Sequence, residues 1–293
     1  MLKNRHCCVW ICCKAERSCP MASQRQWLGD LRAALDLMKQ GQPQSCIEAL
    51  EKLAARYPDD ALCRALVLDG MGRANFALQR PEAAIKALED SVELLRSTLG
   101  PTAPMTLGAM QNLAHALLGI GKVEESLAIG RESLHLTVEV CGPDSPQVAE
   151  AQLRLSAAYY RKRDFDRAES LMRKAKEIWE KQGFCVPQLG VCLNNLGRIC
   201  EERGQINEGI ALHRQALALR RELLGENDET AFSLGNLGVA LASDGQWREA
   251  AESLQAAVEM YDRLGLGNGE EAQGYKKNLE VCLQAMADTP SKA

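Results

Sequence analysis

The chain of 293 residues is poor in aromatic side chains, which make up only 4% of it. Strands are normally enriched in aromatic and β-branched residues, whereas this chain is rich in Ala and Leu, so its composition favours closely packed helices over a sheet. No apolar run approaches the ~20 residues that a membrane-spanning helix needs. These absences predict an all-α protein without a membrane span.

Sequence features of catalysis and of metal or nucleic-acid binding are also missing. The four histidines form no H-x-x-x-H or H-E-x-x-H pair, and no Gly-rich loop is followed by Lys and Ser or Thr. We interpret His213 as a packed core residue, and Cys192 and Cys200 lack a neighbouring His or Asp to activate a nucleophile. The net charge of -4 argues against a general affinity for nucleic acid, and Arg220-Arg221 is interpreted as a solvated helix face. We therefore expect no enzyme activity, no cofactor, no bound metal and no nucleic-acid partner.

The first twenty residues differ from the rest of the chain because they are basic and contain five of the twelve cysteines. We predict that residues 1–20 form a disordered Cys-rich tail, with Met21 as an alternative start. Reversible acylation of the paired cysteines, metal binding by His6 with the thiols, and a vestigial export signal are the other interpretations. The remaining cysteines are scattered, which is typical of free thiols in a reducing compartment and predicts a cytoplasmic location.

Small residues recur along the chain at a spacing of 41–42. In each regular repeat, a small residue that follows a Leu is succeeded twelve residues later by a second and seven residues further on by a third. These triplets are Ala114, Ser126 and Ser133; Ser156, Ala168 and Ala175; Gly197, Gly209 and Ala216; and Gly238, Ala250 and Ala257. The pattern extends back to Gly72, and more loosely to Ala34. Small side chains in register mark points where helices approach closely, so this period predicts a stacked array of helical repeats.

Each repeat is predicted to consist of a helix, a short turn and a second helix. The turns are expected at Gly41, Gly121, Gly204 and Gly245, with Gln79 and Arg163 at the equivalent positions. We place the array at 21–264, with repeats near 27–60, 62–100, 104–142, 146–184, 187–225 and 229–264. Residues 265–293 are expected to form a capping helix and a tail, because a stacked array needs a polar end.

The arrangement resembles the tetratricopeptide repeat, most clearly at Leu196-Gly197, Gly204, Gly209 and Ala216. The first-helix Trp of that family is missing throughout, and its Tyr is present only as Tyr159. The period of 41–42 residues is longer than is usual for this family and is similar to that of the subclass found in kinesin light chains. The segments 192–197 and 224–228 are also similar to that subclass. The resemblance covers about 30–264. It implies a right-handed α-solenoid of about six helix-turn-helix repeats with a C-terminal capping helix.

In this family the first helix of each repeat lines a concave groove, so the resemblance places particular first-helix positions in that groove. The residues at these positions are Arg73, Asn112, His115, Arg154, Arg161, Asn194, Asn195, Arg198 and Asn236. Asn amides suit the backbone of an extended peptide, and Arg suits carboxylates. The alternative is that the Asn side chains only bond to the neighbouring repeat and that the Arg side chains are merely solvated.

The predicted function is a non-catalytic protein–protein interaction scaffold. It would bind an extended peptide or protein segment, acidic or C-terminal, in the groove. A regulatory module that binds a short signalling peptide is one alternative. A self-associating structural subunit is the other, so the partner could also be a second copy of the chain.

Overall fold

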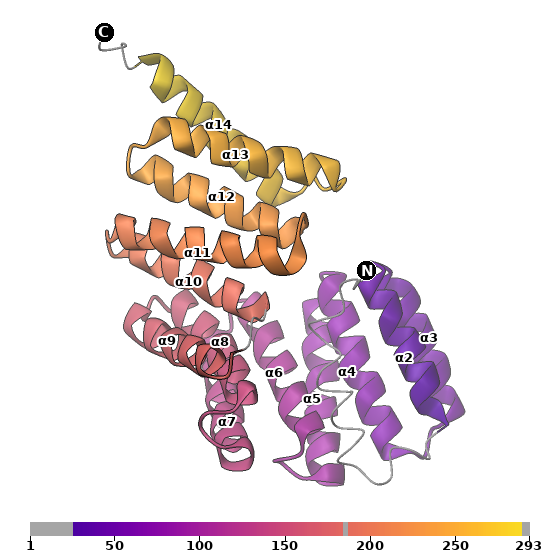
Figure 1. Cartoon of the computed structure of the whole chain (residues 1–293). Coiled ribbons are helices and arrows are strands. Elements are labelled where there is room, and N and C mark those ends of the chain that lie inside the picture. Colours follow the sequence, from indigo (N-terminus) through magenta and orange to yellow (C-terminus); the bar gives the residue numbers. More distant parts are fainter. Residues whose placement is uncertain (1–25, 184–186, 289–293) are drawn as a thin grey trace. The chain divides into compact units, whose positions relative to one another are not determined.

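The computed structural model describes residues 26–183 and 187–288 of the chain (Figure 1). Within these two ranges the chain forms thirteen helices and no strand, which confirms an all-α repeat fold. None of these helices combines the length and the apolar character that crossing a bilayer requires. The Cys-rich segment 1–20, predicted to be a tail, lies outside the described residues. The helices fall into two compact units that meet in the sequence at Asp164 and Phe165, and each is described separately.

The described residues of the first unit form seven helices, and each helix packs against the next one along the chain. They are α2 (Trp27–Lys39), α3 (Pro43–Arg56), α4 (Ala61–Ala77), α5 (Pro81–Leu99), α6 (Pro104–Gly119), α7 (Val123–Cys141) and α8 (Pro146–Arg161). The alternate helices α2, α4, α6 and α8 also contact one another in that order. They are therefore the first helices of successive repeats and share one face of the unit.

In the second unit, the residues that the structure describes form six helices with the same packing pattern. They are α9 (Phe165–Lys181), α10 (Pro187–Glu202), α11 (Ile206–Leu224), α12 (Asp228–Ser243), α13 (Trp247–Arg263) and α14 (Glu270–Asp288). Here α10, α12 and α14 are the contacting alternate helices, and α14 packs on both α12 and α13. Helix α14 therefore takes the place of a further first helix, which is where a capping helix is expected.

The recurrent small residues lie where the two helices of a repeat touch. A Cβ atom added to Gly72 in α4 would lie 2.5 Å from Cγ of Leu88 in α5. The same atom on Gly238 in α12 would lie 2.6 Å from Cγ of Leu254 and 3.1 Å from the carbonyl oxygen of Ala250. The two distances to leucine Cγ atoms are shorter than real Cβ contacts, so the close helix approach depends on glycine at these points.

The turns within the repeats adopt the left-handed backbone conformation at every predicted position. The φ angle is positive at Gly41, Gly121, Gly204 and Gly245, as it is at the two non-glycine positions. For Gln79 it is 56° and for Arg163 it is 62°. The equivalence of these two residues with the turn glycines is therefore confirmed, even though this conformation costs a non-glycine residue roughly 1–2 kcal/mol.

Candidate functional site

A row of polar side chains crosses α4 and α6 on the first-helix face of the first unit. Asn112 donates a hydrogen bond from Nδ2 to Oδ1 of Asp69 over 2.8 Å, so the row begins with an inter-repeat contact. Arg73 lies one turn from Asp69 on α4, with Nη1 3.7 Å from Oδ2 of the carboxylate. Burial raises the pKa of Asp69, while the charge of Arg73 and the hydrogen bond from Asn112 act in the opposite direction.

The row continues through His115 to α8. The imidazole of His115 meets the ring of Phe76 from α4 edge-to-face, with 5.3 Å between ring centroids. Loss of water around the ring and the positive charge of Arg154 lower the pKa of His115. At neutral pH the ring is therefore uncharged and offers one donor and one acceptor nitrogen. The ring contact places His115 of α6 beside Phe76 of α4, and α6 also packs against α8, which carries Arg154.

The two arginines of α8 differ in how their charge is met. Arg154 donates from Nε to Oε1 of Glu150 over 2.9 Å, so a carboxylate of its own helix already faces it. Arg161 lies two turns further along α8, is exposed, and forms no ion pair within the described residues. Arg161 is thus an exposed arginine of α8 whose charge meets no carboxylate in the described part of the chain.

In the second unit, Asn194 occupies a different environment from the one expected. Its side chain is 1% exposed. It donates from Nδ2 to Oγ of Ser233 over 2.8 Å, and its Oδ1 accepts from Nδ1 of His213 over 2.9 Å. In this structure Asn194 connects α10 to α11 and α12, which corresponds to the alternative interpretation of an inter-repeat contact.

The other predicted residues of the second unit lie closer to its surface. Asn195 is half-buried and Arg198 is exposed, both on α10. Asn236 on α12 accepts a hydrogen bond at Oδ1 from the hydroxyl of Tyr275 over 3.1 Å. Its Nδ2 is buried and has no partner within the described residues. The three Asn side chains at 112, 194 and 236 therefore all contact a neighbouring repeat.

A buried polar network was not predicted from the sequence. It runs through Glu201, His213, Asn194, Ser233, Arg220 and Glu229. His213 is fully buried, which confirms its interpretation as a core residue, and its Nε2 lies 2.6 Å from Oε1 of Glu201.

The interpretation of Arg220 as a solvated residue is wrong, because its side chain enters the core and the residue is only 3% exposed. It donates from Nη1 to the carbonyl oxygen of Glu229 and to Oγ of Ser233, each over 2.8 Å. The stem of Arg220 passes Gly190, where a Cβ atom would lie 2.9 Å from Nε. A glycine facing a long side chain in the next helix was the only sequence signal of this burial.

The described cysteines behave as core residues. All except Cys141 are buried, and none is joined in a disulfide within the described part of the chain. Burial is the largest effect that raises the pKa of Cys192 to about 12 and of Cys200 to about 11. These two thiols are therefore poor nucleophiles at neutral pH. In the same part of the chain, no three His, Cys, Asp or Glu side chains are grouped as metal ligands.

Comparison with protein families gives matches over nearly the whole repeat array. Two family models, each described as the tetratricopeptide repeat, match the chain. One covers residues 102–181 and 190–263, which is more than half of the chain, and the other covers residues 31–104.

Two curated relatives from Arabidopsis thaliana match shorter stretches. Protein KINESIN LIGHT CHAIN-RELATED 1 is 31% identical over 104 residues, which is 35% of this chain. Protein KINESIN LIGHT CHAIN-RELATED 3 is 28% identical over 108 residues, or 37% of this chain. The matched stretch spans 17% of the length of each of these relatives.

Solved structures share the fold at low sequence identity. The crystal structure of BtubC (BKLC) from P. vanneervenii has a TM-score of 0.62 at 18% identity and covers 80% of this chain and 92% of that one. A Rap protein complexed with Competence and Sporulation Factor has a TM-score of 0.61 at 14% identity and covers 90% of this chain and 78% of that one.

Proposed function

The chain belongs to the tetratricopeptide repeat family, with repeats similar to those of kinesin light chains, and on this basis we propose that it is a non-catalytic scaffold binding an extended polypeptide segment. Repeat arrays of this kind present a long continuous surface rather than a closed pocket, which suits another chain better than a small substrate. The proposed surface is the first-helix face of each unit.

The row from Asp69 to Arg154 carries this proposal for the first unit. It joins three consecutive first helices through the Asn112–Asp69 hydrogen bond, the His115–Phe76 ring contact and the proximity of His115 to Arg154. A continuous strip of donors, acceptors and one aromatic ring matches the repeating amides and side chains of an extended segment.

An acidic side chain or a C-terminal carboxylate is the group that we propose at the α8 end of this strip. Arg154 and Arg73 already face Glu150 and Asp69, so an incoming carboxylate has to compete for them. Arg161 is exposed and carries no such partner within the described residues. A carboxylate therefore gains most from Arg161, through a charge-assisted hydrogen bond.

In the second unit, Asn195, Arg198 and Asn236 are the corresponding proposed contacts. Asn195 and Asn236 are half-buried, so part of each residue reaches the surface, and Arg198 is exposed. Asn194 is a support for this face, because it is buried between helices. The first-helix faces of the two units are separate binding surfaces in this function.

Affinity capture with charge-reversed variants tests the proposal. The full chain, Arg161→Glu and the matched control Arg131→Glu would be immobilised and the retained proteins quantified by mass spectrometry. Arg131 is also an exposed arginine, but it lies on the second helix α7. Synthetic segments of retained proteins would then be titrated, with at least about tenfold weaker binding expected for Arg161→Glu only. Equal binding by all three proteins would refute the acidic end of the proposal, and failure of every segment to bind the wild type would refute the scaffold.

A peptide-responsive regulator is the second candidate. The Rap protein that shares this fold was solved in complex with Competence and Sporulation Factor. A regulator of this type would change shape when a bound segment is added, whereas a rigid scaffold would keep its radius of gyration. Solution scattering with and without a captured segment separates these two functions, and light scattering tests the third idea, self-association.

A further inference from the structure

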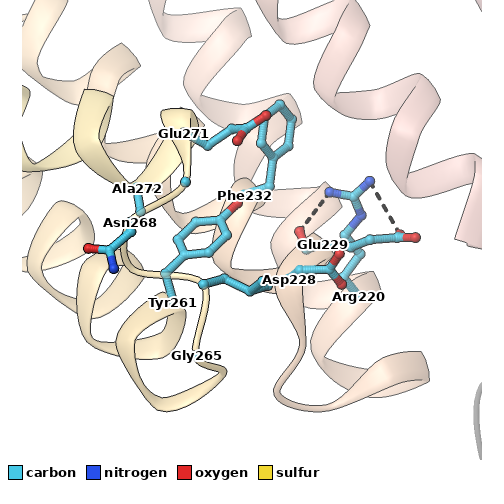
Figure 2. A pocket seen from close by; sticks show the side chains of 11 residues that line it. Arg220, Asp228, Glu229, Phe232, Tyr261, Gly265, Asn268, Glu271 and Ala272 are labelled. Atoms are coloured by element: carbon cyan, nitrogen blue, oxygen red, sulfur yellow. Dashed lines mark hydrogen bonds and ion pairs between the residues drawn. The ribbon is translucent and has the colours of Figure 1, made fainter. Parts of the chain in front are cut away.

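A cavity of about 430 Å³ opens in the second unit where the ends of α11 and α13 meet the starts of α12 and α14 (Figure 2). None of the nine residues proposed to contact an extended segment lines it. Its apolar wall consists of the rings of Phe232 and Tyr261 together with Leu266 and Ala272. Leu266 is 46% exposed, so the cavity has an apolar rim that is open to solvent.

The charged groups of the cavity are predominantly acidic. Asp228, Glu229 and Glu271 face a single cation, Arg220, which leaves a surplus of negative charge. The guanidinium of Arg220 is already engaged, because its Nη2 lies 3.5 Å from Oε2 of Glu229 and its Nη1 donates two hydrogen bonds. Asp228 and Glu271 form no ion pair within the described residues. Their two carboxylates are therefore free to act on a ligand.

The hydroxyl of Tyr261 is a second, independent feature of this wall. Tyr261 is 6% exposed and stacks on Tyr275, with 6.2 Å between ring centroids. Its hydroxyl makes no hydrogen bond to any residue that the structure describes. Burial, followed by the charges of Glu271 and Asp228, raises the pKa of Tyr261 to about 12. A hydroxyl group without a hydrogen-bond partner in the described structure thus lies near two carboxylates that form no ion pair there.

We propose that this cavity binds the side chain of a lysine or arginine from a partner polypeptide. The ammonium or guanidinium group supplies the donors that Asp228, Glu271 and the Tyr261 hydroxyl accept. Its aliphatic stem packs on Phe232 and Leu266, while aromatic rings favour a cation near their faces. An anion would be repelled by the surplus of negative charge, since three carboxylates line the cavity and its one guanidinium is already paired with Glu229. This site is separate from the proposed first-helix surface. It binds a cationic side chain, whereas that surface is proposed to bind a carboxylate.

The direct test is an NMR titration of the ¹⁵N-labelled full chain with capped Gly-Gly-X-Gly-Gly peptides at millimolar concentration. Position X is lysine, arginine or norleucine, which keeps the stem but removes the charge. Lysine and arginine should produce saturable shifts at the amides of residues 228–232 and 261–272, with norleucine at least about tenfold weaker. Equal binding of norleucine, or no saturable shift at these amides, would overturn the proposal.

Variants assign the binding to the cavity. Glu271→Gln should weaken lysine-peptide binding by about fivefold, as for a partly exposed ion pair, and Tyr261→Phe should weaken it by about threefold. The matched control is Glu270→Gln, because Glu270 also lies in the first turn of α14 but does not line the cavity. Its affinity should equal that of the wild type. If Glu270→Gln and Glu271→Gln weaken binding equally, the cavity is not the site.

A free amine distinguishes a small-molecule site from a polypeptide site. The lysine peptide should bind more tightly than n-butylamine, because the flanking backbone adds contacts at the rim. Equal affinity for butylamine would contradict a polypeptide ligand. The result is independent of the Arg161 experiment, since that residue belongs to the first unit and the cavity belongs to the second.

Discussion

The α10–α11 and α12–α13 repeats place different side chains at the same position of their cores. In α12–α13, the space left by Gly238 is filled by Leu254, which is fully buried. In α10–α11, the equivalent space beside Gly197 is filled by His213, whose ring would lie 2.7 Å from an added Cβ atom. The two glycines and their partners are sixteen residues apart in both repeats, so the packing geometry is shared and the chemistry is not.

The difference lies in what each core residue needs from its neighbours. Leu254 is stabilised by removal of apolar surface from water, which has no directional requirement. His213 requires hydrogen-bond partners, which it finds in Asn194 and Glu201. Since Asn194 also bonds to Ser233 of α12, the histidine repeat is linked to the next repeat by specific contacts. A polar core residue thus constrains which helices lie together, which an aliphatic residue does only through shape.

Replacing the core leucine of the α12–α13 repeat with histidine should cause the largest loss of stability. Leu254→His places an imidazole in a fully buried site where Gly235 and Ala242 occupy the positions equivalent to Asn194 and Glu201, so neither partner is present. We expect the free energy of unfolding to fall by about 3 kcal/mol or more, because apolar contacts are lost and a polar group is buried without partners. Urea unfolding followed by circular dichroism measures this. Leu254→Met, which conserves volume, should cost less than about 1.5 kcal/mol, and similar losses for the two variants would contradict the argument.

The reverse exchange should be milder. His213→Leu fits beside Gly197 as Leu254 fits beside Gly238, but it leaves Oδ1 of Asn194 buried without its donor. We expect the free energy of unfolding to fall by about 1–3 kcal/mol. Glu201 loses less, since its side chain is 19% exposed and can turn to water. The exposed His135 provides the control, because His135→Leu removes no buried hydrogen bond. A rise in the free energy of unfolding for His213→Leu would contradict this expectation. It would show that the desolvation penalty of the histidine exceeds the stabilisation from its two hydrogen-bond partners.

Local sequence pattern was sufficient for the frame of the fold. The turns at Gln79 and Arg163 were predicted from register alone, because a fixed period places them where the other repeats carry glycine. The contacts of Gly72 and Gly238 follow from the same periodicity. These features recur from repeat to repeat, so one sequence contains several examples of each of them.

The polar network could not be predicted in the same way. Burial of Arg220 depends on Gly190, thirty residues earlier, and on Glu229 and Ser233 in the next helix. No helical period relates these positions, and a single charged residue in a helix is normally solvated. Likewise, the groove position of Asn194 was inferred from family geometry, whereas its burial depends on His213 replacing an aliphatic residue in this repeat only.

The smallest change in stability is expected for a glycine beside which no other side chain occupies the space of a Cβ atom. Gly274 in α14 has no atom within 4 Å of an added Cβ, whereas the Cβ of Gly235 would lie 2.1 Å from the Tyr275 ring. Gly274→Ala should therefore raise the free energy of unfolding by about 0.5–1 kcal/mol. Alanine reduces the conformational freedom of the unfolded chain, and its Cβ atom meets no neighbour in the folded helix. Gly235→Ala, measured in the same urea titration, should lower it by about 1–3 kcal/mol as Tyr275 is displaced. The opposite signs separate glycines that make room for a neighbour, as Gly197 and Gly238 do, from one that does not. A loss of stability in both variants would mean that α14 packs more tightly around Gly274 than its open surroundings indicate.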